Sequence, residues 1–154
     1  MRFVCDVMLG KLAKYLRIFG LDTVYAKTGG EFEQYMVPDQ GTGPYLFTRR
    51  LRVRPRDRIV IIRSDRPKDQ LKEIWHVISP YVDPGNVMSR CIECNAALVE
   101  VSRADIEQYV PEYIFHRYKS FKQCPACRKV YWDGSHTLHM SQFIEEVTLD
   151  QSTQ

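Results

Sequence analysis

Two C-x-x-C pairs carry the most specific chemistry in the sequence. Cys91 and Cys94 form the first pair and Cys124 and Cys127 the second, with 29 residues between the pairs. Thiolates at this spacing bind one ion from a tight turn, and four of them complete a tetrahedral zinc site. The gap exceeds the roughly 15–20 residues of a usual ribbon, so we expect a longer finger. We predict that the four cysteines bind structural zinc; the alternative is that they form disulfides or lie separately in the core.

Acidic residues near predicted strand ends form a second candidate group. Asp6 directly follows a short apolar run, and Asp65 follows a β-branched one, while Glu31 and Glu33 lie in a short predicted helix. Ligands of open α/β sheets bind at the carboxyl ends of the strands. Two or more carboxylates there can hold Mg²⁺ or Mn²⁺ and support phosphodiester hydrolysis. Taken singly, each of these residues also fits a surface or capping role, and Asp6 could cap the helix that follows it.

Basic residues are concentrated in two places, although the formal net charge is only +3. Lys11, Lys14 and Arg17 recur at three-residue intervals, which gives one predicted helix a basic face. An arginine-rich segment follows the third predicted strand. Its alternate arginines would form a ridge suited to phosphates if the segment is extended. A solvated loop or a charge-protected edge strand is the alternative. The arginines of this region are Arg49, Arg50, Arg52, Arg54, Arg56, Arg58, Arg63 and Arg66.

The elements that must position these residues alternate between strand and helix. Apolar and β-branched runs predict strands over residues 2–5, 23–26, 45–48 and 58–62. Helical spacing predicts helices over residues 8–19, 31–36 and 68–78. This alternation is typical of βαβ units, so the first part of the chain is predicted to be α/β with a mostly parallel sheet flanked by helices.

The character of the sequence changes at a Pro/Gly-rich segment over residues 79–85. We therefore predict a first domain over residues 1–84 and a small zinc-ribbon module with a C-terminal helix over residues 85–150. The second part has few aliphatic residues, so bound metal must supply some of its stability. Its aromatic and basic residues either stack on nucleic-acid bases and hold phosphates or, for at least half of the rings, form the ribbon's own core. They are Tyr113, Phe115, Arg117, Tyr118, Lys119, Phe121 and Lys122.

Composition limits the class of protein. The chain has 154 residues, of which 44% are hydrophobic, and this is typical of a folded globular protein. It contains no run of 18 apolar residues and no hydrophobic leader at its N-terminus. We therefore expect a cytoplasmic protein without a membrane span, in which cysteines stay reduced. Cys5 is expected to be a small buried residue.

Several segments together resemble one known family. They are residues 3–17, Leu46-Phe47-Thr48-Arg49, Asp69-Gln70-Leu71, residues 90–95 with Leu98, and Cys124-Pro125-Ala126-Cys127 leading into residues 131–136. In this order they are similar to the Mut-seven C-terminal RNase family. The resemblance implies a PIN-like fold with a zinc ribbon, four zinc-binding cysteines, and metal-dependent RNA cleavage at an acidic cluster headed by Asp6. It also implies that Lys11 and Arg17 lie beside the phosphate path.

One position departs from the family pattern, because Arg50 stands where an aspartate usually follows Thr-Arg. An inward guanidinium would pair with Asp6 and compete with a divalent cation, whereas an outward one would leave Asp6, Glu31 or Glu33, and Asp65 to bind an ion. The leading hypothesis is a Mg²⁺- or Mn²⁺-dependent ribonuclease with these four catalytic carboxylates. Its predicted RNA-binding residues are Lys11, Lys14, Arg17, Arg49 and Arg50. The alternatives are a catalytically impaired RNA-binding zinc-ribbon protein and a protein-interaction module.

Overall fold

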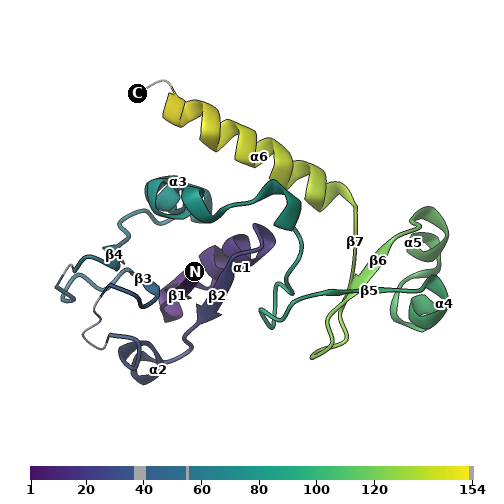
Figure 1. Ribbon diagram of the computed structural model, residues 1–154, viewed down its shortest axis with the longest axis horizontal. Helices are drawn as coiled ribbons and strands as arrows, with labels where there is room; N and C mark the ends of the chain where they lie inside the picture. Colours follow the sequence, from purple (N-terminus) through teal and green to yellow (C-terminus); the bar gives the residue numbers. More distant parts are fainter. Residues whose placement is uncertain (37–40, 55, 153–154) are drawn as a thin grey trace.

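The computed structural model describes residues 1–36, 41–54 and 56–152, and Figure 1 shows the arrangement of its elements. The strands are β1 (Arg2–Cys5), β2 (Asp22–Tyr25), β3 (Tyr45–Thr48), β4 (Ile59–Ile61), β5 (Val99–Val101), β6 (Phe121–Gln123) and β7 (Val130–Trp132). The helices are α1 (Gly10–Ile18), α2 (Gly29–Glu33), α3 (Pro67–Ile78), α4 (Arg103–Ile106), α5 (Glu112–Arg117) and α6 (Ser135–Ser152).

Strands β1 to β4 form one parallel sheet in the order β2-β1-β3-β4. Alternate side chains of β1 serve its two faces, since Phe3 and Cys5 contact α1 and α3 whereas Val4 contacts Phe32 of α2. Because both faces are covered, the central strands are apolar throughout instead of alternating. This architecture confirms the predicted α/β fold with a parallel sheet flanked by helices.

In its described residues, 49–54 and 56–58, the arginine-rich segment between β3 and β4 is a turn-rich loop and not an extended strand. The loop interpretation is therefore confirmed, and the extended ridge is wrong. Arg58 closes the loop by donating to the carbonyls of Gly41 and Gly43 and by lying 5.0 Å above the ring of Tyr45.

The second sheet is antiparallel, in the order β5-β6-β7. One of its faces packs on the short helices α4 and α5 through Ile106, Ile114 and Phe121. Tyr113, in contrast, is exposed, so the aromatic residues of this module divide between core and surface. In the part of the chain that the structure describes, no helix has the length and apolar character needed to cross a membrane.

Helix α6 returns to the first part of the chain and passes above α3 in the view of Figure 1. Met140 and Phe143 join the core that α1 and α3 build, and the Phe143 ring lies 6.4 Å from that of Tyr15. The helix that the sequence assigns to the ribbon module thus packs against the first domain.

Candidate functional site

The four cysteines converge, with all their sulfur atoms within 4.8 Å of one another. They come from two matching turns, which we call the first knuckle (residues 91–95) and the second knuckle (residues 124–128). In each knuckle the second cysteine's N–H donates to the first cysteine's Sγ at 3.4 Å. The residue after the second cysteine has a positive φ in both turns, 64° at Asn95 and 66° at Arg128. The sequence spacing therefore folds into a tetra-thiol site.

The charges of these thiols fit a bound cation. Burial raises the pKa of Cys91, but the Tyr131 hydroxyl and nearby amides donate to its sulfur and lower that pKa to about 7. The pKa of Cys94 is raised to about 12, first by its hydrogen bond with Cys127 and then by burial and the neighbouring thiolates. Four thiolates cannot all ionise at this separation without a central positive charge, and four sulfur ligands in a closed set are those of structural zinc. The cluster can hold a zinc ion.

Asp6 lies at the carboxyl edge of the parallel sheet and is completely buried. Its Oδ1 accepts a hydrogen bond of 2.9 Å from Met8 N, so it caps the turn that leads into α1. Its Oδ2 accepts from the Thr48 hydroxyl and, at 3.3 Å, from Arg49 N. The fold thus fixes this carboxylate from β1, β3 and the turn before α1.

Arg50 points into the same place. Its Nε lies 3.9 Å from Asp6 Oδ2, and its Nη1 lies 3.6 Å from Glu33 Oε1. The guanidinium also lies 5.7 Å above the Phe32 ring, and it faces Gly29 at a distance that leaves little room for a side chain there. Arg50 therefore links two of the predicted catalytic carboxylates.

The other two predicted catalytic carboxylates are engaged elsewhere. Glu31 Oε2 accepts from Lys27 N at 2.7 Å and supports the start of α2. Asp65 is largely exposed and pairs with Arg49. Among the described residues, the carboxylates of this edge do not form a group of three with their oxygens close together, whereas the cysteines do form such a group.

Three predicted RNA-binding residues lie along α1, and they have different surroundings. Lys11 is exposed. Lys14 pairs with Glu93 of the first knuckle at 2.8 Å. Arg17 is buried and donates to three carbonyl oxygens, those of Thr23 in β2 and of Ile92 and Glu93 in the first knuckle, at 3.0, 2.7 and 2.9 Å. These hydrogen bonds of the Arg17 guanidinium connect the first knuckle to α1 and β2.

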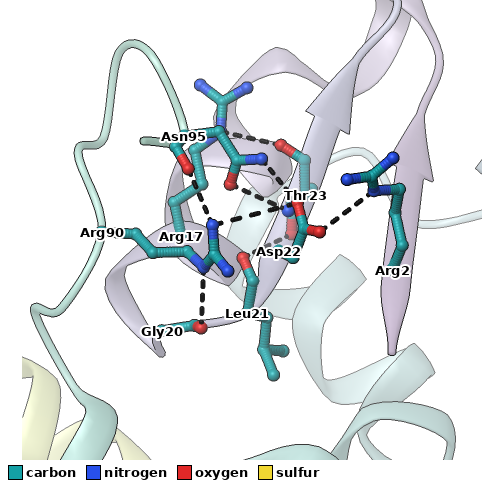
Figure 2. A network of polar contacts seen from close by, with 8 residues as sticks. All are labelled: Arg2, Arg17, Gly20, Leu21, Asp22, Thr23, Arg90 and Asn95. Atoms are coloured by element: carbon teal, nitrogen blue, oxygen red, sulfur yellow. Dashed lines mark hydrogen bonds and ion pairs between the residues drawn. The ribbon is translucent and has the colours of Figure 1, made fainter. Parts of the chain in front are cut away.

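Figure 2 shows the rest of this junction, which sequence reasoning missed. The Asn95 amide donates to Asp22 Oδ1 at 2.7 Å and accepts from Thr23 N at 3.0 Å. Arg90 donates to the Asn95 carbonyl at 2.8 Å and to the Gly20 carbonyl at 3.2 Å. Asn95 thus serves as a hydrogen-bonding partner for the outer edge of β2, which is the edge strand of the sheet. We call the contacts of Arg17, Asp22, Arg90 and Asn95 at this junction the knuckle clamp.

Comparison with known proteins supports the resemblance noted in the sequence. The family model of the Mut7-C RNAse domain matches residues 1–144. The chain belongs to the Mut7-C RNAse domain family. No curated protein and no solved structure matches it. Membership of an RNase domain family supports a nuclease function in general and RNA as the substrate class.

Proposed function

We propose that this chain is a metal-dependent ribonuclease that hydrolyses RNA phosphodiester bonds at the carboxyl edge of its parallel sheet. The observation that carries the proposal is the arrangement of Asp6, a fully buried carboxylate held by three donors and faced by Arg50. A buried carboxylate next to an arginine, at the edge where α/β sheets bind ligands, suits phosphate chemistry. The RNase family of the chain points to the same substrate.

Asp6 and Glu33 have the oxygen donors that Mg²⁺ and Mn²⁺ prefer, and they are the residues that we expect to hold the ion. At 3.9 Å and an effective dielectric near 20, the attraction between Asp6 and Arg50 is about 4 kcal/mol before screening. The guanidinium and the ion therefore compete for the same negative charge. When bound, the ion would supply an activated water and neutralise charge on the phosphate.

Bound RNA can remove Arg50 from this competition, because an RNA phosphate can bind the guanidinium in place of Asp6. A phosphate offers a guanidinium two parallel hydrogen bonds, which are stronger than the long contact between Arg50 and Asp6. Arg50 would then hold the phosphate and release the carboxylates, while Arg49 and the exposed Lys11 add positive charge nearby. Asp6 keeps its position because Thr48 and two backbone amides bind it independently of Arg50.

The test is cleavage of a labelled single-stranded RNA with Mg²⁺, with Mn²⁺ and without added divalent ion. We expect cleavage only with an added divalent ion. We also expect Arg50→Asp to reach its half-maximal rate at a metal concentration at least about tenfold lower than the wild type, because the substitution replaces a guanidinium that competes with the ion by a carboxylate that can bind it. Equal metal requirements in the two proteins would contradict the proposed competition.

An RNA-binding protein without turnover is the second candidate, and the position of Arg50 between Asp6 and Glu33 favours it. It is supported if the wild-type chain cuts no RNA with either ion yet binds RNA with a steep salt dependence. In both cases we propose that residues 1–84 contact the RNA and that residues 85–150 form the zinc ribbon. We also propose a cytoplasmic location, where thiols stay reduced and available to zinc.

A further inference from the structure

A groove of about 1070 Å³ runs between α1, the start of α3 and α6. It is not part of the acidic site, and its walls come from both predicted domains. Four cations line it together with two carboxylates, and the cations are thus in excess. The charged lining residues are Lys11, Lys14, Arg66, Lys68, Asp69 and Glu146.

The groove opens at the same edge of the sheet as Asp6. Helix α1 follows β1 and helix α3 follows β4, so both helices begin at the carboxyl edge of the parallel sheet. Lys11 lies in the first turn of α1, and Arg66 immediately precedes α3. From there the groove continues along α1 past Tyr15, with α6 on its other side.

Three of the cations are available to a phosphate, and Lys68 is one of them because its described contact is with a ring and not with a carboxylate. Among the contacts of the described residues, no carboxylate pairs with Lys11 or Arg66, and both side chains are exposed. Lys14 is held by Glu93, and the Lys68 ammonium lies 5.4 Å above the Phe143 ring. The half-buried ring of Tyr15 adds an aromatic surface of the kind on which bases stack.

We propose that this groove holds single-stranded RNA next to the acidic site, with Lys11, Arg66 and Lys68 on its phosphates. The proposal rests on the proposed function and adds the path of the substrate. A chain of phosphates matches the excess of cations, and bases can use the aromatic lining. The volume of about 1070 Å³ is slightly larger than that of pockets for small ligands, about 300–1,000 Å³, and suits a few nucleotides of a single strand better than a duplex.

The test is binding of a fluorescein-labelled single-stranded RNA, measured by anisotropy without divalent ions so that no cleavage occurs. The double variant Arg66→Glu/Lys68→Glu reverses two charges at the N-terminus of α3, where negative side chains favour the helix. Each phosphate contact adds about 0.7 to the steepness with which the logarithm of the affinity falls with the logarithm of the salt concentration. Losing two contacts should therefore weaken binding about 25-fold near 0.1 M salt and reduce this slope by about 1.4. Lys11→Glu, which leaves the contact of Lys68 with Phe143 intact, weakens it about fivefold.

The control is Arg117→Glu/Lys119→Glu, which makes the same charge change at exposed positions of the ribbon. We expect it to change binding less than about threefold, since its charges are screened from the groove. Equal losses in both double variants, no loss in the groove variants, or equally tight binding of duplex RNA would overturn the proposal. Cleavage that is lost in Asp6→Asn but unchanged in the groove variants refutes the groove alone. Groove-dependent binding without any cleavage refutes only the proposed nuclease activity.

Discussion

Replacing Asn95 with glycine removes the side chain that joins the first knuckle to the edge of β2. Asn95 has a φ of 64°, which glycine adopts freely, so the turn itself should persist. Two hydrogen bonds are lost, at 2.7 Å to the Asp22 carboxylate and at 3.0 Å from Thr23 N. A bond to a charged group contributes about 1.5–3 kcal/mol and a neutral one about 0.5–1.5 kcal/mol.

Because Asp22 is only partly buried, the lower half of this range applies, and we expect Asn95→Gly to lower the free energy of unfolding by about 2–3 kcal/mol. The matched control is Arg128→Gly. Arg128 has the equivalent position in the second knuckle with a φ of 66°, and its side chain is exposed. The same change in backbone entropy occurs in both variants, so their difference isolates the Asn95 amide.

The assay is denaturant unfolding of the zinc-bound protein followed by tryptophan fluorescence. Trp75 packs against Phe19 in the first domain, whereas Trp132 lies in the ribbon. In a Trp132→Phe background, fluorescence therefore reports the first domain. Asn95→Gly should lower its stability by the stated amount, and Arg128→Gly should change it by less than about 0.5 kcal/mol. Equal effects of the two variants would refute the view that the first knuckle supports the first sheet.

The zinc site, Asp22 and helix α6 each offer a further test. Removing zinc with a chelator should lower the midpoint of thermal unfolding that is followed by Trp75 fluorescence. The decrease should be smaller in Asn95→Gly, because the knuckle clamp connects the zinc site to the first sheet; an unchanged wild-type midpoint would contradict this coupling. Burial raises the pKa of Asp22, but hydrogen bonds from Asn95 and Arg2 outweigh it and leave that pKa below its usual value. The contribution of the Asp22 carboxylate to the free energy of unfolding is therefore present above about pH 4 and lost at lower pH. As the pH falls below about 4, the free energy of unfolding of Asp22→Asn should decrease less steeply than that of the wild type. Phe143→Ala should cost about 3–5 kcal/mol of unfolding free energy, whereas Leu138→Ala on the exposed face of α6 should cost less than about 0.5 kcal/mol; similar costs would argue against the docking of α6.

The elements with local patterns could be predicted from the sequence. The C-x-x-C spacing located the thiol cluster, and the apolar runs located β1 to β4 within one or two residues. The predicted helix over residues 8–19 starts instead with a 3-10 turn over Val7–Leu9, because Asp6 accepts from Met8 N and caps that turn. Asp6 therefore caps this turn, as the sequence suggested. The same carboxylate also faces Arg50.

The long-range contacts could not be predicted from local patterns. Arg17 looks like a phosphate-binding residue by its spacing, yet the knuckle carbonyls that it binds are 75 and 76 residues away. The apolar face of α6 was recognisable, but periodicity does not say which surface covers a face. Asn95 offered one usable clue, since asparagine directly after a C-x-x-C turn is suited to a positive φ.

RNA cleavage by Asp6→Asn, compared with cleavage by Asp65→Asn, shows whether the buried Asp6 is the catalytic carboxylate; thermal unfolding confirms that both variants fold. Both variants remove one negative charge at the predicted acidic site, but Asp6 is buried at the sheet edge and Asp65 is exposed. We expect Asp6→Asn to reduce the Mn²⁺-supported rate by at least about a hundredfold and Asp65→Asn to reduce it by less than about tenfold. A folded Asp6→Asn variant that cleaves RNA at the wild-type rate would show that Asp6 has no catalytic role.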